Sequence, residues 1–227
     1  MARTTVPSPY RKAVGGNMVF NGDFEIAPVV NVATTTGGKW IDGTASGSSA
    51  TKGPYGWALS YVSGTVGASF DSTVSRSGTY SLKLSQLDTS SDVIVSQSKL
   101  SSTPTRWELN NQLQAALPST SYTLTLWAKT NNVVTNGVYA DIREFNGAGS
   151  AIVTSPTAKL SGTNDWTRLS LTLTTNSSTR FIGIMLRNTV GGNVCDAWFD
   201  DITLTKTTPE TRTVAGTRSV ATGRSVA

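Results

Sequence analysis

Several stretches in the second half of the chain alternate apolar and polar residues with a period of two, and this pattern constrains the fold most strongly. It runs through residues 122–129, 138–145 and 166–175, whereas residues 181–186 are apolar on both faces. A period of two places alternate side chains on opposite faces of a strand, and a doubly apolar run is typical of a central, covered strand. The apolar sets are Tyr122, Leu124, Leu126 and Ala128, then Val138, Ala140 and Ile142, and finally Leu169, Leu171 and Leu173. The sequence therefore predicts an all-β fold, a jelly-roll-like antiparallel β-sandwich.

Weaker signals predict further strands in the first half of the chain, at residues 18–26, 57–62, 68–71, 80–85 and 93–98. Residues 27–56 form the longest irregular stretch, which Gly interrupts repeatedly and Ser and Thr fill. Loops of this length in compact domains are usually functional or disordered. Residues 107–113 are expected to form one short helical turn.

The length and composition suit one domain with two arms. The chain has 227 residues, of which 37% are hydrophobic, enough for one β-sandwich with a sizeable core over residues 17–205. Residues 1–16 contain Pro and Gly and no periodic apolar face, so we expect an extended N-terminal arm. Residues 206–227 are expected to form a second extended arm.

The positive charge lies in the arms and not in the predicted domain. The net charge of the chain is +5, but residues 1–16 and 206–227 together carry +6, which leaves −1 for residues 17–205. We expect the arms to dock onto acidic surfaces of protein partners. Solvated, flexible ends are the alternative. Nucleic acid is not the expected partner, because the domain shows no basic face and the arms lack interleaved aromatic residues.

The C-terminal arm contains a six-residue repeat. Each unit starts with an Arg, at Arg212, Arg218 and Arg224, and continues with a hydroxyl residue, Val and Ala. An even period keeps every Arg and every Val on one face of an extended strand, whereas six residues advance a helix by roughly 240°. We therefore expect an extended strap with repeating Arg and Val contacts. A low-complexity disordered tail is the alternative.

Two motifs bracket the predicted domain. Residues 21–25 read Asn-Gly-Asp-Phe-Glu, and residues 198–204 read Trp-Phe-Asp-Asp-Ile-Thr-Leu. Between them come, in order, Ser-Gly-Thr-Tyr-Ser-Leu-Lys-Leu at 77–84, Tyr-Thr-Leu-Thr-Leu-Trp-Ala-Lys at 122–129 and Asp-Trp-Thr-Arg-Leu at 165–169. This ordered set resembles the calcium-containing β-sandwich carbohydrate-binding modules that are appended to many xylanases and endoglucanases, with relatives in phage virion proteins. The resemblance implies the fold more directly than the function, because proteins with one fold have many different functions.

The resemblance also implies a structural Ca²⁺ between the first and last strands. Its side-chain ligands would be Glu25 and Asp201, and backbone carbonyls near Asp23 and over residues 76–78 would complete the shell of oxygen atoms that Ca²⁺ prefers. Such an ion would tie the ends of the sandwich together and would not catalyse. The alternative is that these acids lie exposed at strand ends or cap turns.

Most kinds of catalytic site are absent from the sequence. It contains no His and one Cys, which excludes an intrachain disulfide, the usual Ser-His-Asp and Cys-His sites, and His- or Cys-rich metal sites. Cys195 itself is expected to be a small buried hydrophobe. A paired-carboxylate glycosidase site remains conceivable. Its candidates, which sit in no recognisable motif, are Asp141, Glu144, Asp165 and Asp196. We expect no enzymatic activity.

A glycan site would combine aromatic rings for the apolar faces of sugars with polar groups for the hydroxyls. The polar faces of residues 122–129 and 138–145 offer such side chains. They are Trp127 and Lys129, then Tyr139, Asp141 and Arg143. If these two strands are neighbours, their polar faces make one platform.

A second candidate for glycan binding is the pair Trp40 and Tyr55, the aromatic residues of the long irregular stretch. Trp127 also has an alternative explanation, because it can instead pack under a loop or against an arm. The resemblance also implies core positions for Trp57, Trp166 and Trp198.

The sequence shows no apolar h-region near its N-terminus and no apolar run of roughly 20 residues, so we expect neither a secretory signal nor a membrane span. A glycan-binding module normally works outside the cell. A virion component, made in the host cytoplasm and released by lysis, resolves this conflict. Short Arg-Ser-Val-Ala repeats also resemble those of phage structural proteins.

We therefore expect a non-catalytic virion surface protein, used in capsid decoration or in a tail or fibre. Its arms would bind neighbouring subunits of an oligomeric assembly, and its sandwich would face outward, toward host surface glycans. The alternatives are a cement protein without sugar binding, a free extracellular carbohydrate-binding module of a glycan-degrading system, and an unrecognised glycosidase.

Overall fold

The computed structural model describes residues 16–26, 57–63, 66–90, 92–97, 113–189 and 192–207. Within these ranges the chain forms ten β-strands and no helix. The strands are β1 (Ala58–Ser63), β2 (Val66–Asp71), β3 (Ser81–Gln86), β4 (Asp92–Gln97), β5 (Gln114–Ala115), β6 (Ser121–Phe145), β7 (Ala151–Pro156), β8 (Leu160–Thr174), β9 (Phe181–Asn188) and β10 (Cys195–Lys206). All their pairings are antiparallel, as predicted.

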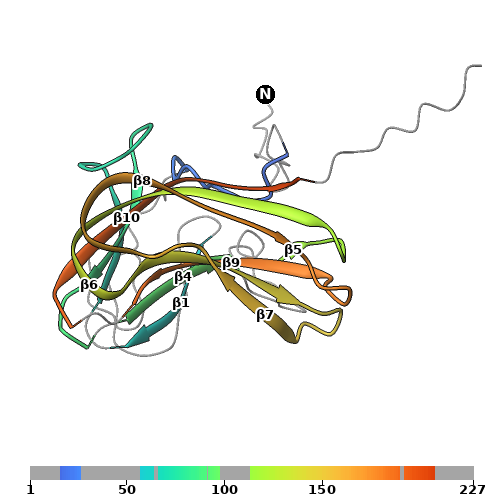
Figure 1. The fold of residues 1–227 in the computed structure, drawn as a ribbon. Coiled ribbons are helices and arrows are strands. Elements are labelled where there is room, and N and C mark those ends of the chain that lie inside the picture. Colours follow the sequence, from blue (N-terminus) through green and yellow to red (C-terminus); the bar gives the residue numbers. More distant parts are fainter. Residues whose placement is uncertain are drawn as a thin grey trace, which may run out of the picture.

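The strands hydrogen-bond into one sheet that folds into two layers, and the 25-residue strand β6 belongs to both. Its first part pairs with β8 and β10, and β3 and β2 follow beyond β10; we call this layer A. Its second part, from Val138 onward, pairs with β9 and β7, and β4 and β1 follow beyond β9; we call this layer B. Figure 1 shows the two layers stacked face to face, with β6 passing from one to the other. This is the predicted jelly-roll-like β-sandwich.

After β6, the chain turns and runs back along the same strand as β7 and then β8. The turn at residues 146–150 is closed by the backbone N–H of Asn146, which donates to the carbonyl oxygen of Ser150 at 3.0 Å. Among the described strands, β7 and β8 pair with β6 alone. These two strands therefore form an edge of both layers.

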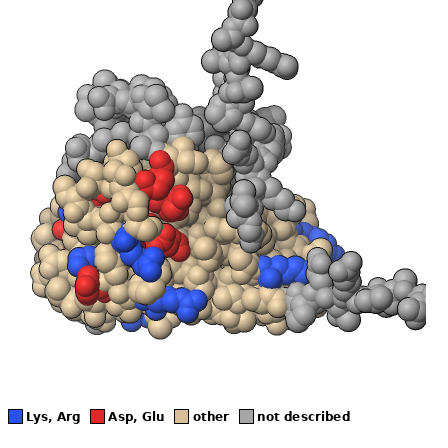
Figure 2. Space-filling model, turned by 90° about the horizontal axis from the view of Figure 1, so that it is seen from above, with Lys and Arg blue, Asp and Glu red and all other residues tan. Residues whose placement is uncertain are grey.

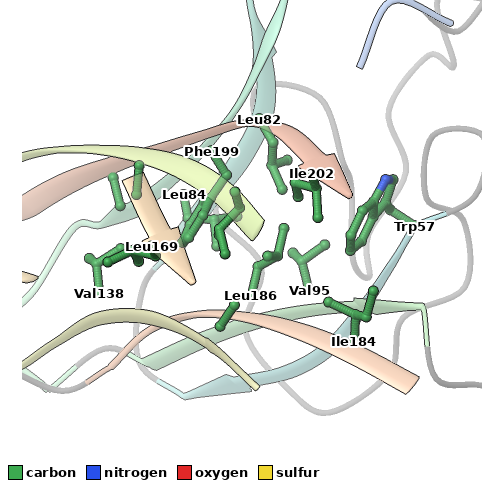
Figure 3. Packing of buried hydrophobic residues seen from close by; sticks show 14 of the residues in the cluster. Trp57, Leu82, Leu84, Val95, Val138, Leu169, Ile184, Leu186, Phe199 and Ile202 are labelled. Atoms are coloured by element: carbon green, nitrogen blue, oxygen red, sulfur yellow. The ribbon is translucent and has the colours of Figure 1, made fainter. Parts of the chain in front are cut away.

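The core lies between the two layers. It contains the apolar sets that the alternation predicts in residues 122–129 and 138–145. Figure 3 shows Leu82 and Ile202 of layer A facing Ile184 and Leu186 of layer B. Trp57, only 1% exposed, lies at one end of this cluster, as predicted. Full burial of one such side chain stabilises a fold by about 1.5–3 kcal/mol.

The other residues expected in the core differ in their burial and in the face of the sheet on which they lie. Cys195 is buried, as predicted. Trp198 is also buried, but it alternates with the core residues Ala197 and Phe199 and therefore points to the outer face of layer A, where its Nε1 donates to Asp71 at 2.8 Å. Trp166 is partly exposed and is not part of the core, which corrects the prediction. It lies on the edge strand β8, where neighbouring strands cover a side chain from one side only.

The predicted strand at residues 18–26 is wrong, because residues 16–26 form a series of bends and turns. Asn21 and Phe24 have φ angles of 48° and 56°, in the left-handed region that interrupts a strand. The side chain of Asn21 replaces the ladder bonds of a strand, since its Oδ1 accepts from the N–H of Ile26 at 2.9 Å. Asn side chains favour such local bonds, and this competes with regular structure.

Residues 16–26 instead bond across the end of β10. The N–H of Met18 donates to the carbonyl of Leu204 at 2.8 Å, and the N–H of Ile202 donates to the carbonyl of Gly22 at 2.8 Å. The side chain of Asn17 takes part as well, because its Oδ1 accepts from the N–H of Leu204 at 2.9 Å. These bonds satisfy the backbone of β10 where its register against β6 shifts, between Asp200 and Thr203. The segment therefore acts as a clip on the last strand.

The other predicted strands of the first half are confirmed, with boundaries shifted by one or two residues, as β1, β2, β3 and β4. The predicted helical turn at residues 107–113 lies outside the described residues, apart from Leu113. Residues 1–15 and 208–227, which make up nearly all of the two predicted arms, also lie outside them. No helix among the described residues has the length and apolar character needed to cross a membrane.

Candidate functional site

Three of the predicted glycan-binding residues lie together on the outer face of layer B. Val138, Ala140 and Ile142 of β6 point into the core, so the residues that alternate with them point outward. The outward set is Tyr139, Asp141 and Arg143, and β9 brings Arg187 opposite Tyr139 and Met185 opposite Asp141. Lys159, between β7 and β8, reaches the same face. We call these six residues the layer B cluster.

A buried ion pair lies at the centre of the layer B cluster. Asp141 is only 2% exposed, and its Oδ2 accepts from Nε of Arg187. Burial raises the pKa of Asp141, and the positive charge of Arg187 acts in the opposite direction. Nη2 of Arg187 also contacts Sδ of Met185 at 3.5 Å. Removal of either partner of a buried pair leaves the other charge uncompensated, which is strongly destabilising. The pair is therefore expected to hold both side chains in place.

The aromatic ring of the cluster lies between two cations. Nζ of Lys159 is 4.7 Å from the ring centroid of Tyr139, and Cζ of Arg187 is 5.8 Å from it. Burial raises the pKa of the Tyr139 hydroxyl. Further along β6, Cζ of Arg143 is 5.5 Å from the ring centroid of Phe145. The face therefore combines one half-buried aromatic ring with charged groups of both signs, a composition suited to polar ligands.

The structure does not bring Trp127 and Lys129 to this cluster, which corrects the prediction of one shared platform. The two stretches are halves of the single strand β6, and each half belongs to a different layer. Since Leu126 and Ala128 point into the core, Trp127 and Lys129 point outward from layer A. The two sets therefore lie on opposite outer faces of the sandwich.

On the outer face of layer A, Trp127 is covered by a side chain from the loop before β3. Cζ of Arg76 lies 3.9 Å from the ring centroid of Trp127, and the same guanidinium pairs with Asp201. Lys129 pairs with Asp165 at 2.6 Å. Figure 2 views the molecule from the side of layer A and shows acidic and basic groups next to one another, with uncharged surface around them. Trp127 thus packs under a loop residue, which was the alternative explanation for it.

Five of the predicted site residues fall outside the part of the chain that the structure describes. Trp40 and Tyr55 lie outside the described residues, and so do Arg212, Arg218 and Arg224.

The acids predicted to hold calcium gather around residues 76–80, where they accept hydrogen bonds. Oε1 of Glu25 accepts from the N–H groups of Thr79 and Tyr80, each at 2.8 Å. Oδ1 of Asp201 accepts from the hydroxyl of Ser77 at 2.7 Å, and its Oδ2 accepts from Arg76. Asp23 is exposed.

Asp200, which the sequence analysis did not single out, completes this arrangement. It is fully buried, and its Oδ2 accepts from the N–H groups of Arg76 at 2.9 Å and Ser77 at 3.2 Å. Burial raises the pKa of Asp200 to about 6, although these N–H bonds act in the opposite direction. Together the three carboxylates of Glu25, Asp200 and Asp201 hold residues 76–80 against β10.

In this arrangement the side chains predicted to bind calcium are bonded to protein donors. In the part of the chain that the structure describes, no three His, Cys, Asp or Glu side chains are grouped so that they could hold a metal ion. The cation that neutralises Asp201 is the guanidinium of Arg76. Calcium binding by Glu25, Asp201 and the backbone near Asp23 therefore stays a prediction, which thermal unfolding with and without added calcium would test.

The four carboxylates considered for glycosidase chemistry have separate partners. Asp141 pairs with Arg187, Asp165 with Lys129 and Asp196 with Lys83. Glu144 points the other way from Asp141, and its Oε2 accepts from the N–H of Asn176 and the hydroxyl of Thr179. Each carboxylate thus holds its own part of the structure.

Sequence reasoning missed Arg187, Met185, Lys159 and Arg76. Arg187 directly follows the apolar run at residues 181–186, so its position in a strand was visible, but its partner depends on the register of β9 against β6. Lys159 and Arg76 lie in short connections, where no periodicity indicates a neighbour. These contacts depend on strand pairing, which a single sequence does not specify.

Comparison with solved structures finds this fold in known proteins. A structure described as "Family 16 Carbohydrate Binding Module-2" matches with a TM-score of 0.50 at 17% sequence identity, over 84% of this chain and 100% of that chain. The enzymatically active domain of tailspike protein 4 from bacteriophage CBA120 matches with a TM-score of 0.54 at 16% identity, over 88% of this chain and 22% of that chain. The sequence matches no protein-family model and no curated protein. At these identities the likeness concerns the fold, and the chain has the all-β jelly-roll fold of carbohydrate-binding modules.

Proposed function

We propose that this protein is a non-catalytic surface component of a phage virion, and that it binds host glycans through the layer B cluster. The observation that carries the proposal is this cluster itself. It places the ring of Tyr139 among Asp141, Arg143, Lys159 and Arg187, on one face of a carbohydrate-binding-module fold. Sugar sites combine these two kinds of group. The likeness to a tailspike domain, and the Arg-Ser-Val-Ala repeat, support the virion part of the proposal.

We expect Tyr139→Ala to lower the affinity for a bound glycan by about tenfold, which corresponds to about 1.4 kcal/mol, because it removes the aromatic surface of the cluster. A glycan array identifies a ligand, and calorimetric titration then measures the change. Tyr139→Phe keeps the ring and serves as the control with a smaller loss. Trp127→Ala lies on the opposite face and should leave the affinity unchanged, provided the variant is folded. Equal losses for Trp127→Ala and Tyr139→Ala would place the site elsewhere.

We propose further that the arms attach the protein to neighbouring virion subunits. The chain leaves the domain after β10, where the N–H of Thr207 donates to the carbonyl of Ser121 at 2.9 Å, close to the paired end of β8 at Thr174. Among the described strands, β8 has a partner on one side only, so its other edge presents backbone groups that can pair with a further strand. The sequence of residues 208–227, which is basic and is predicted to be extended, suits this kind of attachment.

Removal of residues 208–227 is expected to reduce incorporation into particles to background, without changing the unfolding midpoint of the domain. Quantitative mass spectrometry of purified particles measures incorporation, and circular dichroism checks the fold. As a matched control, Arg212, Arg218 and Arg224 are replaced by Lys, which keeps the charge but not the planar guanidinium. Normal incorporation of the truncated protein would contradict the role of the strap.

Two other functions remain alternatives to this proposal, and each has its own signature. A cement protein without sugar binding would be incorporated into particles but give no signal on a glycan array. A free carbohydrate-binding module of a glycan-degrading system would bind glycans but not assemble with virion subunits. Release of reducing sugar from a bound glycan would contradict the non-catalytic part of the proposal.

A further inference from the structure

The cations of the layer B cluster outnumber the carboxylates available to them. Arg187 and Asp141 pair with each other, and Asp92 at the end of β4 is a further acid on which Arg187 acts electrostatically. Arg143 and Lys159 have no carboxylate within ion-pair distance among the described residues. Their closest described contacts are with aromatic rings, Phe145 for Arg143 and Tyr139 for Lys159. Three cations therefore face two carboxylates, a surplus of one positive charge, and neither Arg143 nor Lys159 forms an ion pair with a described residue.

One of these cations also carries a buried donor that lacks an acceptor. Nε of Arg143 is buried and makes no hydrogen bond to any residue that the structure describes. A buried donor left unsatisfied is costly, and most buried polar groups in native proteins have a partner. Because Nε itself is buried, a ligand oxygen could reach only the accessible atoms of this partly exposed side chain. The guanidinium is held in place over the Phe145 ring, so little side-chain freedom would be lost on binding.

The positions of the two cations suit an extended ligand. Arg143 and Tyr139 lie four residues apart on the same face of β6, which corresponds to about 13 Å along a strand. Lys159 stands next to the Tyr139 ring at one end of this span. Asp141 lies between them; it is ion-paired with Arg187 and also attracts Arg143 and Lys159 electrostatically. The two cations that form no ion pair with a described residue, Arg143 and Lys159, therefore lie at opposite ends of this span, and the Tyr139 ring lies beside Lys159.

We propose that the ligand of this site is an acidic glycan, whose carboxylate or phosphate groups bind Arg143 and Lys159 while a sugar ring lies against Tyr139. This inference rests on the proposed glycan binding by the layer B cluster and specifies its ligand class. Charge-assisted hydrogen bonds from guanidinium to carboxylate or phosphate are roughly twice as strong as neutral ones, and Arg presents its donors in a fork that matches both anions. A neutral glycan would leave both charges unpaired.

The test uses the full-length protein on an array of matched oligosaccharides at about 0.15 M salt, where the Debye length of about 8 Å screens distant charges. Each neutral oligosaccharide is printed beside the form oxidised to the uronate at C6 and the form phosphorylated at C6. We expect binding to the acidic members of the pairs at least about tenfold tighter than to the neutral ones. The preference between uronate and phosphate then identifies the anion.

Three charge-matched variants separate this site from general attraction to a basic protein. Arg143→Gln and Lys159→Gln should each weaken binding of the best acidic oligosaccharide by about tenfold. Arg168→Gln removes the same charge from an exposed position opposite Trp127, on layer A, and should leave the affinity unchanged. Lys159 is exposed, so its variant tests the proposal even if Arg143→Gln proves unstable.

The outcomes distinguish this inference from the function on which it rests. Equal or tighter binding of the neutral oligosaccharides overturns the acidic ligand and leaves glycan binding intact. Equal losses in all three variants also overturn it, since the attraction would then come from net charge alone. Absence of binding to every oligosaccharide overturns both the ligand class and the proposed glycan binding.

Discussion

Gly22→Ala is expected to lower the free energy of unfolding by about 2–4 kcal/mol, because the clip formed by residues 16–26 has no room for a methyl group at this position. A Cβ on Gly22 would overlap the carbonyl oxygen of Ile202 and come within 3.2 Å of Cγ1 of Val19. The overlapping atom belongs to the backbone of β10, and Ile202 is also bonded to Gly22 through its N–H, at 2.8 Å. The clip and β10 cannot move apart to make room for the methyl group without breaking that hydrogen bond. Urea denaturation of both proteins measures the difference.

Gly67→Ala is the matched control for this prediction. A Cβ on Gly67, in β2, would meet the Cβ of Ser85 at 3.5 Å, which is ordinary van der Waals contact. Alanine there should change stability by less than about 1 kcal/mol, in either direction. If both variants unfold at the same urea concentration as the parent, the clip does not hold β10 in solution.

Trp57→Ala is expected to be at least as destabilising, by about 3–5 kcal/mol. The side chain is 1% exposed and packs beside Phe24, with ring centroids 5.6 Å apart. Its Nε1 donates to the carbonyl of Asn21 at 3.0 Å, so the substitution would also leave a buried carbonyl of the clip without its donor. The lost packing and the lost hydrogen bond act in the same direction.

Trp57→Phe separates these two contributions. Phenylalanine keeps much of the packing volume but cannot donate to Asn21, so we expect a loss of about 1–3 kcal/mol. Trp166→Ala, at the partly exposed Trp on the edge strand β8, should cost less than Trp57→Ala. Thermal and urea unfolding of the three variants compares them. A larger loss for Trp166→Ala than for Trp57→Ala would contradict the assignment of the core.

Much of the sandwich was predictable because a period of two in a sequence has a direct structural meaning. Tyr122, Leu124, Leu126 and Ala128 are all buried, as the alternation indicated, and residues 181–186 are a central strand between β4 and β6. Each of these predictions concerns one strand and the face that it buries. Neither requires knowledge of which strands are neighbours.

The errors arose where local sequence and long-range contacts differ. Residues 18–26 have apolar residues at strand-like positions, but the side chains of Asn17 and Asn21 bond to the backbone and replace a ladder with a clip. The prediction that Trp127 and Tyr139 share one platform was wrong for a different reason. Periodicity gave the outward faces correctly, but did not reveal that residues 122–145 form one strand shared by two layers.

In the candidate site, too, some residues were predictable from their spacing, whereas their partners depend on long-range contacts. Tyr139, Asp141 and Arg143 were predicted as a polar face from their spacing, and the structure places them on one face. Their partners Arg187 and Lys159 come from β9 and from the connection after β7, so they depend on strand register and on the path of a short connection. Likewise, Asp201 and Glu25 were found by motif, but the guanidinium that pairs with Asp201 was not.

The sequence by itself determined which residues are apolar, where most of the sandwich strands run and which face most of them bury, because these properties follow from the identity and spacing of nearby residues. Only the tertiary structure decided that β6 passes from one layer to the other, that residues 16–26 clip β10, and which charges remain unpaired beside Tyr139. These features arise from contacts between residues far apart in the chain. Such contacts depend on the free energy of the whole fold, and the residues of one short segment do not determine that free energy.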